Sequence, residues 1–376
     1  MKKNTSREKM IRTMTAGVFC LFVFGMSAVN LFAEKKDFSE NENRVLVPFP
    51  SVSAQNILFG DFDTDFEKWF SDHFVGRDSW IRRKASLRID TGAIENNGVW
   101  LARNGRLIQQ FLTYDEKTVT SNISCLQEFS DDTGMKLNIL LVPSAAWGEQ
   151  QYLPAGAVNV NEQELIREIA ASLPKQNCID ISDAVRQIDD GYFRTDHHWN
   201  EKGALIGYQA ICQSVLQKDA QQFTFEEVSD NFRGTMYSRS GAFWTPAESI
   251  FRIRPAKEMP VQVVFEDGTT MNTMFVDEHL QEKDQYPYYL DGNHGHISIR
   301  TGASGGRRAV VIKDSYAHIL LPYLAQEYAQ IDVFDLRYYT DSVSDHISEE
   351  ERDRTDVYVI YGLPTFCSDS NLSILW

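Results

Sequence analysis

The sequence has few cysteines, and they are not arranged to bind zinc. Five occur in 376 residues, and one of them, Cys20, lies inside an apolar segment near the N-terminus. The other four show no CxxC pair and no Cys/His finger spacing; they are Cys125, Cys178, Cys212 and Cys367. A zinc ribbon is therefore disfavoured, while one or two disulfides stay open in an oxidising compartment.

The chain also lacks the excess of basic residues typical of nucleic-acid-binding proteins. Lys and Arg number 37 against 53 Asp and Glu, and the formal net charge is -16. Most of this surface would repel a phosphate backbone, so we do not expect a nucleic-acid partner. The basic residues gather at the N-terminus, where residues 1–12 hold five of them and one acidic residue.

Long hydrophobic runs are absent apart from one. Residues 13–33 (TMTAGVFCLFVFGMSAVNLFA) are uncharged and mostly apolar, and about 20 such residues span a bilayer as a helix. Because basic residues precede this segment, the positive-inside rule keeps the tail, residues 1–12, in the cytoplasm and sends the rest of the chain outside. We predict a single-pass signal-anchor at the cell membrane. A signal peptide, cut near Ser27 and Ala28 or at Ala33, is the alternative and would give a secreted protein.

The segments after the apolar run predict a spacer and then a helix. Residues 34–56 are polar and contain prolines, which is typical of an extended stalk. Between residues 59 and 87, large aromatic residues recur at three- and four-residue steps, which predicts one amphipathic helix. We expect this aromatic stripe to pack in a core rather than lie on lipid.

Residues 57–376 predict one α/β domain. Short apolar runs typical of buried parallel strands occur at 137–143, 177–182, 308–314, 330–336 and 356–362. Helix candidates alternate with them at 115–133, 161–173, 200–217 and 317–329. This alternation predicts an open, mostly parallel sheet with helices on both faces. Residues 223–306 interrupt the alternation with Gly, Pro and short alternating segments, so we expect an insertion rich in β-structure and loops.

One polar stretch combines an acid with two histidines. It is RTDHHWNEKGA at 194–204, in which Asn200 is a plausible N-cap of the following helix. A carboxylate that holds one imidazole nitrogen leaves the other nitrogen free to take a proton from a nucleophile. The stretch therefore predicts an Asp–His pair rather than histidines that only pack.

A serine follows an apolar strand in AVVIKDSYAH at 309–318. At a turn from strand to helix, the hydroxyl of Ser315 would lie at the carboxyl edge of the sheet, where open α/β folds bind ligands. Backbone N–H groups at such a turn, with the adjacent Asp314, are candidates for contact with an oxyanion or substrate.

Two further loops offer candidate oxyanion or substrate residues. Gly292 and Asn293, in YPYYLDGNHGH at 286–296, could supply an N–H and an amide, although these dipeptides are equally typical of a β-turn. Arg337 and Tyr338 follow a strand in DLRYY at 335–339, where the guanidinium could bind an anionic or sugar group or form a structural salt bridge.

Together, DHHW at 196–199, IKDSYA at 312–317, GNH at 292–294 and FSENENRVLVPFP at 38–50 resemble the DHHW protein family. That family is similar to SGNH hydrolases and to the periplasmic alginate O-acetyltransferases. The resemblance implies an SGNH-like fold, with Ser315 as nucleophile, His198 as base and Asp196 as the residue that orients it. It assigns no role to His197 and implies no cofactor. Ordinary SGNH enzymes carry Gly-Asp-Ser near the N-terminus, whereas here Lys313 replaces the glycine and the order of the motifs is reversed.

Several functions follow as hypotheses. An O-acetyltransferase would pass an acyl group from Ser315 to an extracellular polysaccharide, and the resemblance implies a multispanning membrane acyltransferase as the acyl donor. An acetyl esterase would use the same residues with water as acceptor. A non-catalytic carbohydrate-binding or assembly protein would use aromatic residues such as Trp147, Trp244 and Tyr237. A metal hydrolase built from Asp196 and the histidines at 197, 198, 294 and 296 is disfavoured, because adjacent histidines rarely chelate one ion.

Overall fold

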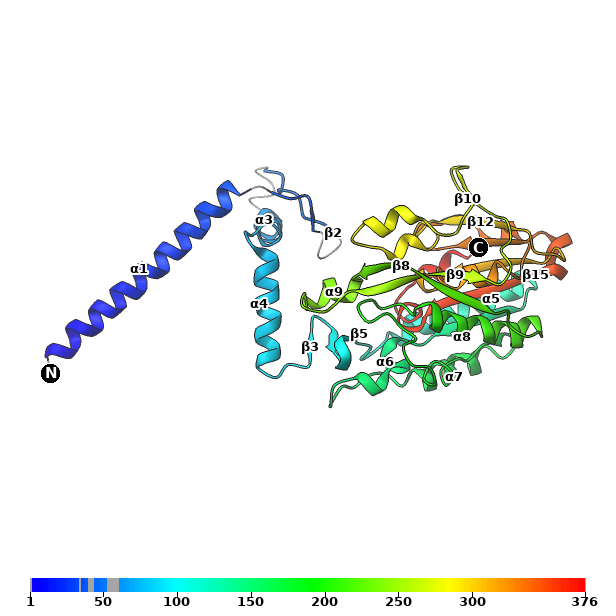
Figure 1. Cartoon of the computed structure of the whole chain (residues 1–376), viewed down its shortest axis with the longest axis horizontal. Coiled ribbons are helices and arrows are strands. Elements are labelled where there is room, and N and C mark those ends of the chain that lie inside the picture. Colours follow the sequence, from blue (N-terminus) through cyan, green and yellow to red (C-terminus); the bar gives the residue numbers. More distant parts are fainter. Residues whose placement is uncertain (1, 34, 40–43, 53–60, 376) are drawn as a thin grey trace. The chain divides into compact units, whose positions relative to one another are not determined.

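The computed structural model describes residues 2–33, 35–39, 44–52 and 61–375. The chain divides into two compact units, residues 1–87 and residues 88–376. The sequence places the start of the α/β domain at residue 57, whereas the unit that holds the large sheet begins at residue 88 (Figure 1).

In the described part of the first unit there are three helices and one short strand pair. Helix α1 (Lys2–Phe32) is followed by β1 (Phe38–Ser39), which pairs antiparallel with β2 (Arg44–Val45), and by α3 (Asp61–Asp72) and α4 (Arg77–Asp90). Within α1, residues 7–32 are long and apolar enough to cross a bilayer. This helix begins at Lys2, inside the segment expected to form a cytoplasmic tail.

The prediction of one helix over residues 59–87 was wrong, because the chain forms two. Residues 59 and 60 lie outside the described residues, and α3 ends at Asp72 before α4 begins at Arg77. Between the two helices Gly76 has φ +69°, a left-handed conformation that glycine adopts without steric cost. The aromatic spacing ends at Phe74, which lies between the two helices, and the next aromatic residue is Trp80 in α4.

The second unit is built on an eight-stranded mixed sheet. In spatial order the strands are β11 (Thr270–Met271), β10 (Val261–Phe265), β12 (His296–Thr301), β14 (Gln330–Phe334), β13 (Arg308–Lys313), β15 (Thr355–Gly362), β6 (Leu137–Val142) and β7 (Asn177–Cys178). The last five pair in parallel and the first three antiparallel. The five predicted parallel strands are therefore confirmed, although β7 is only two residues long.

The predicted insertion at 223–306 is only in part separate from this sheet. Strands β8 (Phe223–Phe232) and β9 (Glu248–Pro255) form a hairpin of their own, whereas β10, β11 and β12 extend the main sheet. Strand β12 joins because it pairs with β14 over five residues and turns Ile297 and Ile299 into the core. The antiparallel direction of β12 hid it from a search for parallel strands.

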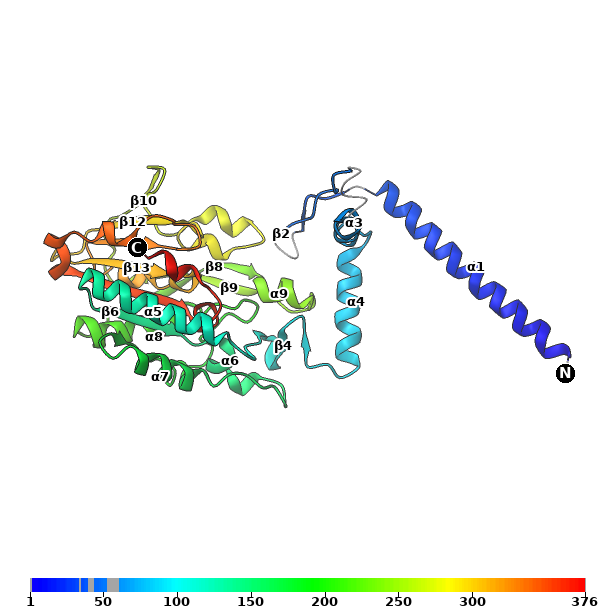
Figure 2. The same cartoon turned by 180° about the vertical axis from the view of Figure 1, so that it is seen from behind.

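Alternate residues of each central strand face two separate cores. In β13, Ala309 and Val311 pack in one core, and Val310 and Ile312 pack in the other. Helix α8 (Glu201–Ile211) and the β8–β9 hairpin cover the first face, while α5 (Glu116–Thr133) and α7 (Glu162–Ser172) contribute to the second (Figure 1 and, from behind, Figure 2). The continuous apolar strands in the sequence are explained by this burial on both faces.

Smaller elements complete the unit. They are the sheet of β3 (Glu95–Asn96), β4 (Val99–Leu101) and β5 (Leu107–Gln109), a π-helical turn at Cys212–Leu216, and the short helices α6 (Ala145–Gly148), α9 (Thr235–Ser240), α10 (Leu321–Leu324) and α11 (Leu363–Phe366). The helices predicted at 115–133, 161–173 and 200–217 correspond to α5, α7, and α8 with the π-turn.

The helix predicted at 317–329 is absent. A single 3-10 turn, Ser315–Ala317, and the four-residue α10 occupy this stretch instead. Residues 316–325 are all buried, so the segment offers no solvated helix face, and Pro322 has no N–H for a helical hydrogen bond.

The five cysteines are free thiols in this structure, so neither of the one or two disulfides that the sequence left open is formed. Cys125 and Cys367 pack in one core, whereas Cys212 packs in the core on the other face of the sheet. The sheet therefore separates Cys212 from these two.

The two-faced core yields a stability prediction. Leu126 of α5 is completely buried against the sheet, so Leu126→Ala should lower the free energy of unfolding by about 2–5 kcal/mol. Glu128→Ala, at an exposed position two residues later, should change it by less than about 0.5 kcal/mol. Denaturant unfolding of the full chain, followed by circular dichroism, measures both. Equal effects of the two variants would contradict this assignment of the core face.

Candidate active site

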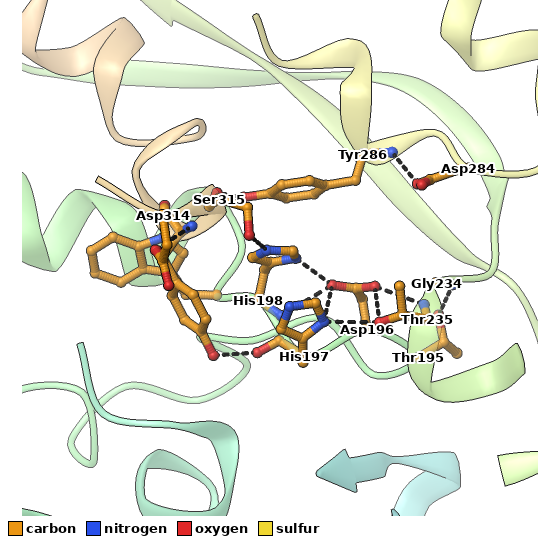
Figure 3. Close-up of polar contacts among 12 residues, drawn as sticks. Thr195, Asp196, His197, His198, Gly234, Thr235, Asp284, Tyr286, Asp314 and Ser315 are labelled. Carbon is orange, nitrogen blue, oxygen red and sulfur yellow. Dashed lines mark hydrogen bonds and ion pairs between the residues drawn. The ribbon is translucent and has the colours of Figure 1, made fainter. Parts of the chain in front are cut away.

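Three predicted site residues lie in one hydrogen-bonded row. Nε2 of His198 is 2.7 Å from Oγ of Ser315, and Nδ1 of His198 is 2.5 Å from Oδ1 of Asp196 (Figure 3). Asp196 is 2% exposed and His198 is 4% exposed. An imidazole that donates Nδ1–H to a carboxylate keeps Nε2 available for the serine proton, so the row has the geometry of a proton relay.

The loop that carries the Asp–His pair joins β7 to α8. Its end is fixed by Asn200, whose side chain accepts hydrogen bonds from the N–H groups of Lys202 and Gly203, so the predicted N-cap is confirmed. Trp199, fully buried, donates from Nε1 to the carbonyl of Tyr316 at 2.7 Å. Tyr316 in turn donates its hydroxyl to the carbonyl of His197 at 2.5 Å. These two bonds join the histidine loop to the serine turn.

Ser315 stands at the first turn after β13, at the carboxyl edge of the sheet. Asp314 shapes this turn, because its carboxylate accepts hydrogen bonds from the N–H of Tyr316 at 2.9 Å and of Gly362 at 3.0 Å. Burial raises the pKa of Asp314 despite these bonds. The expectation that Asp314 contacts an oxyanion or substrate is therefore corrected: the carboxylate is 1% exposed and bonded to the backbone.

The second oxygen of Asp196 is held by α9. Oδ2 accepts hydrogen bonds from the N–H of Thr235 at 2.7 Å and from its hydroxyl at 2.8 Å. The approach is so close that a Cβ on Gly234 would lie 2.4 Å from Asp196. Burial would raise the pKa of Asp196, but the neighbouring imidazoles of His197 and His198 and these hydrogen bonds outweigh it, and its pKa is lowered. Asp196 is therefore ionised across the physiological pH range.

The residue before this aspartate is anchored to β9. The carboxylate of Glu248 accepts hydrogen bonds from the N–H groups of Arg194 and Thr195, both at 2.7 Å, and also bonds the Thr195 hydroxyl. Burial raises the pKa of Glu248 to about 7. The hairpin of β8 and β9 thus fixes the backbone that leads into the site.

Tyr286 packs against one face of the His198 imidazole. Its ring stacks on His198 with centroids 3.9 Å apart and planes 5° apart, and its hydroxyl donates to the carbonyl of Ser315 at 2.8 Å (Figure 3). Thr235, Glu248 and Tyr286 all come from residues 223–306. Sequence reasoning did not select them, because no spacing pattern connects this region to the DHHW loop.

The remaining predicted candidates form a separate group at the end of β14. The guanidinium of Arg337 bonds both oxygens of Asp335 and donates to Oδ1 of Asn293 at 3.2 Å. Tyr338, 56% exposed, lies beside this guanidinium, and the N–H of Gly292 donates to the carbonyl of Tyr289. Arg337 therefore forms the structural salt bridge, and its binding of an anionic or sugar group stays a prediction.

This group is connected to the serine strand through a buried lysine. Nζ of Lys313 donates to Asp335 at 2.8 Å and to Nε2 of His318 at 2.7 Å. Burial lowers the pKa of Lys313 and, together with the charge of Lys313, that of His318. The lysine that replaces the SGNH glycine therefore points into the protein and joins β13 to β14.

The carboxylate and imidazole ligand atoms of the site lie as close together as the ligands of a metal ion do. The ligand atoms of Asp196, His197 and His198 fall within 4.8 Å of one another. Both carboxylate oxygens and both Nδ1 atoms are already hydrogen-bonded, and Nε2 of His198 faces Ser315. His294 bonds the carbonyl of Asp291 instead, and His296 lies near Asp332. The donor set fits proton transfer better than metal binding.

The aromatic residues considered for sugar stacking differ in exposure. Trp147 donates to the carbonyl of Ser182 and is covered by Arg186, and Tyr237 is buried with its hydroxyl on the carbonyl of Phe243. Trp244 alone of these three is exposed. Two of the three rings are therefore part of the packing.

Comparison with known proteins agrees with this fold. Residues 99–276 match the family model of the SGNH hydrolase-like domain of acetyltransferase AlgX, a range that includes Asp196 and His198 and stops before Ser315. This stretch, just under half of the chain, is similar to an SGNH hydrolase-like domain. The resemblance drawn from the sequence is thereby confirmed. No curated protein sequence matches the chain significantly.

Two solved structures share the fold at low sequence identity. A DHHW family protein from Eubacterium siraeum is 22% identical, with a TM-score of 0.65 over 75% of this chain and 96% of that one. PatB1 of Bacillus cereus, solved with a sulfonyl adduct, is also 22% identical, with a TM-score of 0.58 over 73% of this chain and 97% of that one.

A cavity of about 500 Å³ lies beside the DHHW loop, and one carboxyl oxygen of its lining has no hydrogen-bond partner among the described residues. Its walls include Arg106, Arg194, Glu201 and Glu248. Glu201, at the first turn of α8, is 2% exposed, and its Oε2 has no hydrogen-bond partner among the described residues. Burial raises the pKa of Glu201 to about 7.

This carboxyl group predicts a pH-dependent stability. A raised pKa means that the folded state prefers the protonated form, so the stability that Glu201 contributes is lost as pH rises from about 4.5 to above 7. Between pH 5 and pH 8, the free energy of unfolding should decrease less in Glu201→Gln than in wild type. The difference between the two decreases should be at most about 3 kcal/mol. Urea unfolding across this range measures it, with the exposed Glu128→Gln as control. An unchanged slope in Glu201→Gln would contradict the prediction.

Proposed function

We propose that this protein is a serine O-acyltransferase that acetylates hydroxyl groups of an extracellular polysaccharide. The observation that carries the proposal is the unbroken row of hydrogen bonds from Ser315 through His198 to Asp196. The match to an acetyltransferase domain supports the reaction class. In this scheme Ser315 is the nucleophile, His198 the base and Asp196 the residue that orients it.

The surroundings of the row suit acyl transfer. When Ser315 attacks an acyl donor, its proton moves to Nε2 of His198, and the buried, ionised Asp196 stabilises the resulting imidazolium. The stacked Tyr286 ring limits rotation of the imidazole. We propose the backbone N–H of Ser315 and the amide of Asn293, whose oxygen is held by Arg337, as donors to the developing oxyanion.

The N-terminal helix supports a place at the membrane. Helix α1 is compatible with a signal anchor or a signal peptide, and the basic residues before its apolar part favour an anchor with the sheet domain outside the cytoplasm. An anchored domain would be near a multispanning membrane acyltransferase, the donor that the family resemblance implies. We therefore propose transfer from a membrane-bound donor to a surface glycan, with hydrolysis by the same residues as the second candidate.

The acyl-enzyme gives the first test. After incubation of the detergent-solubilised full chain with p-nitrophenyl acetate, intact mass should show one acetyl adduct that peptide mapping places on Ser315. Ser315→Ala should form none, and His198→Ala should slow its formation by roughly 10³-fold or more, because the serine loses its base.

A matched control is His279→Ala. This histidine bonds Glu282 and Asp291 and has no contact with Ser315, so the variant should acylate like wild type. A wild-type chain that forms no adduct and turns over no ester would move the interpretation to the non-catalytic glycan-binding alternative.

The acceptor separates transferase from esterase. Given the polysaccharide isolated from the cells that make this protein, the acetyl group should appear on the glycan faster than in free acetate, because a bound acceptor hydroxyl is held near the acyl-serine. NMR of the glycan and assay of released acetate measure the two products. Release of acetate alone, with authentic glycan present, would establish the esterase.

A further inference from the structure

His197 is held as firmly as the two residues beside it. Its Nδ1 lies 2.8 Å from the Thr235 hydroxyl, its carbonyl accepts the hydroxyl of Tyr316, and its ring lies 3.8 Å from that of His198 (Figure 3). A histidine that only filled space would not need hydrogen bonds at both its ring and its backbone carbonyl. The hydrogen-bonded row of Ser315, His198 and Asp196 does not involve the ring of His197.

The hydrogen bonds fix which nitrogen of His197 carries the proton. The ionised Asp196 can only accept, so the Thr235 hydroxyl donates to it at 2.8 Å. The oxygen of Thr235 must then accept from Nδ1–H of His197. Nε2 of His197 is consequently left without a proton and acts as a hydrogen-bond acceptor.

That acceptor is open to a ligand. The side chain of His197 is 26% exposed, and none of the described residues donates a hydrogen bond to Nε2. Burial and the charge of His198 lower the pKa of His197 to about 4, so the ring stays neutral at physiological pH and Nε2 keeps its lone pair. A fixed acceptor therefore stands next to the base that activates the incoming hydroxyl.

We propose that Nε2 of His197 binds a second hydroxyl of the acyl acceptor and so selects a vicinal diol, as on a sugar ring, over water. The inference rests on the proposed function and specifies its acceptor. One hydroxyl of the diol is positioned for His198, and its neighbour donates to His197. Water has a single oxygen and cannot make both contacts, so the pair of adjacent histidines favours transfer over hydrolysis.

The step balances without any further reactant. The first acceptor hydroxyl attacks the acyl carbon on Ser315 and gives its proton to Nε2 of His198. The bond between the acyl carbon and Oγ then breaks, and Oγ takes the proton back from His198. His197 exchanges no proton and only positions the acceptor.

The test compares two probes of equal ring size on the p-nitrophenyl acetate-loaded full chain. trans-1,2-Cyclohexanediol offers a vicinal pair of hydroxyls, and cyclohexanol offers one. Wild type should acetylate the diol faster by roughly fivefold or more, the value of one neutral hydrogen bond together with the statistical factor. In His197→Phe, which keeps an aromatic ring but loses the acceptor, the ratio should fall to about two, the statistical value.

A second variant separates this role from a structural one. His197→Gln retains an acceptor and should keep the ratio above that of His197→Phe. Both rates in the ratio are measured on the preformed acyl-enzyme of the same variant, so a changed rate of adduct formation does not enter it. An equal ratio in wild type and His197→Phe would overturn the proposal. Loss of adduct formation in His197→Phe would also overturn it, by assigning His197 to the geometry of His198. Absence of an adduct in wild type would instead reject the proposed function itself, on which this inference rests.

Discussion

The buried charge of Asp196 is the constraint on which the rest of the site depends. Removing a carboxylate from water costs several kcal/mol unless nearby donors replace the lost solvation. Asp196 accepts four hydrogen bonds, two from His198 and two from Thr235. These donors come from the loop before α8 and from α9, so the carboxylate can be both buried and ionised only when the two segments meet.

The same convergence extends outward to the serine. Trp199 donates to the carbonyl of Tyr316, and the Tyr316 hydroxyl donates to the carbonyl of His197, so the histidine loop and the serine turn are bonded in both directions. Asp314 holds that turn at the end of β15 by accepting from the N–H of Gly362. Lys313 secures the strand below from the other side through Asp335. Three of these bonds are buried and the one to His197 is partly buried, and an unmade hydrogen bond in such a setting is costly. The parts of the site are therefore positioned together.

The region at 223–306 takes a larger part than its irregular sequence indicates. It supplies Thr235 to Asp196, Glu248 to the backbone before it, and Tyr286 to the face of His198. It also continues the main sheet through β12. The region is therefore better described as the structural support of the site than as an insertion beside it. Its Thr235 bonds the ring of His197 and the carboxylate of Asp196, whereas the ring of His198 bonds Asp196 and Ser315.

The sequence by itself determined the five parallel strands, the helices α5, α7 and α8, and the chemistry-bearing motifs. The apolar runs of β6, β13 and β15 predicted strands correctly because both faces of these strands are buried. Asn200 predicted the start of α8 because its side chain caps that helix. The pairing of Asp196 with His198 is local in the chain and belongs to a recognisable motif. The long-range meeting of this pair with Ser315 followed from the family resemblance.

Only the tertiary structure decided which residues surround that row. Thr235 and Tyr286 reach the site by folding of a region without regular periodicity, and no local rule connects them to a loop tens of residues away. Local patterns also failed where burial or backbone conformation took precedence, as at residues 317–329, where the burial of residues 317–325 and Pro322 accompany short turns in place of a helix. The surrounding residues could not be predicted from the sequence because hydrogen bonds between distant segments depend on three-dimensional position. Spacing along the chain does not determine that position.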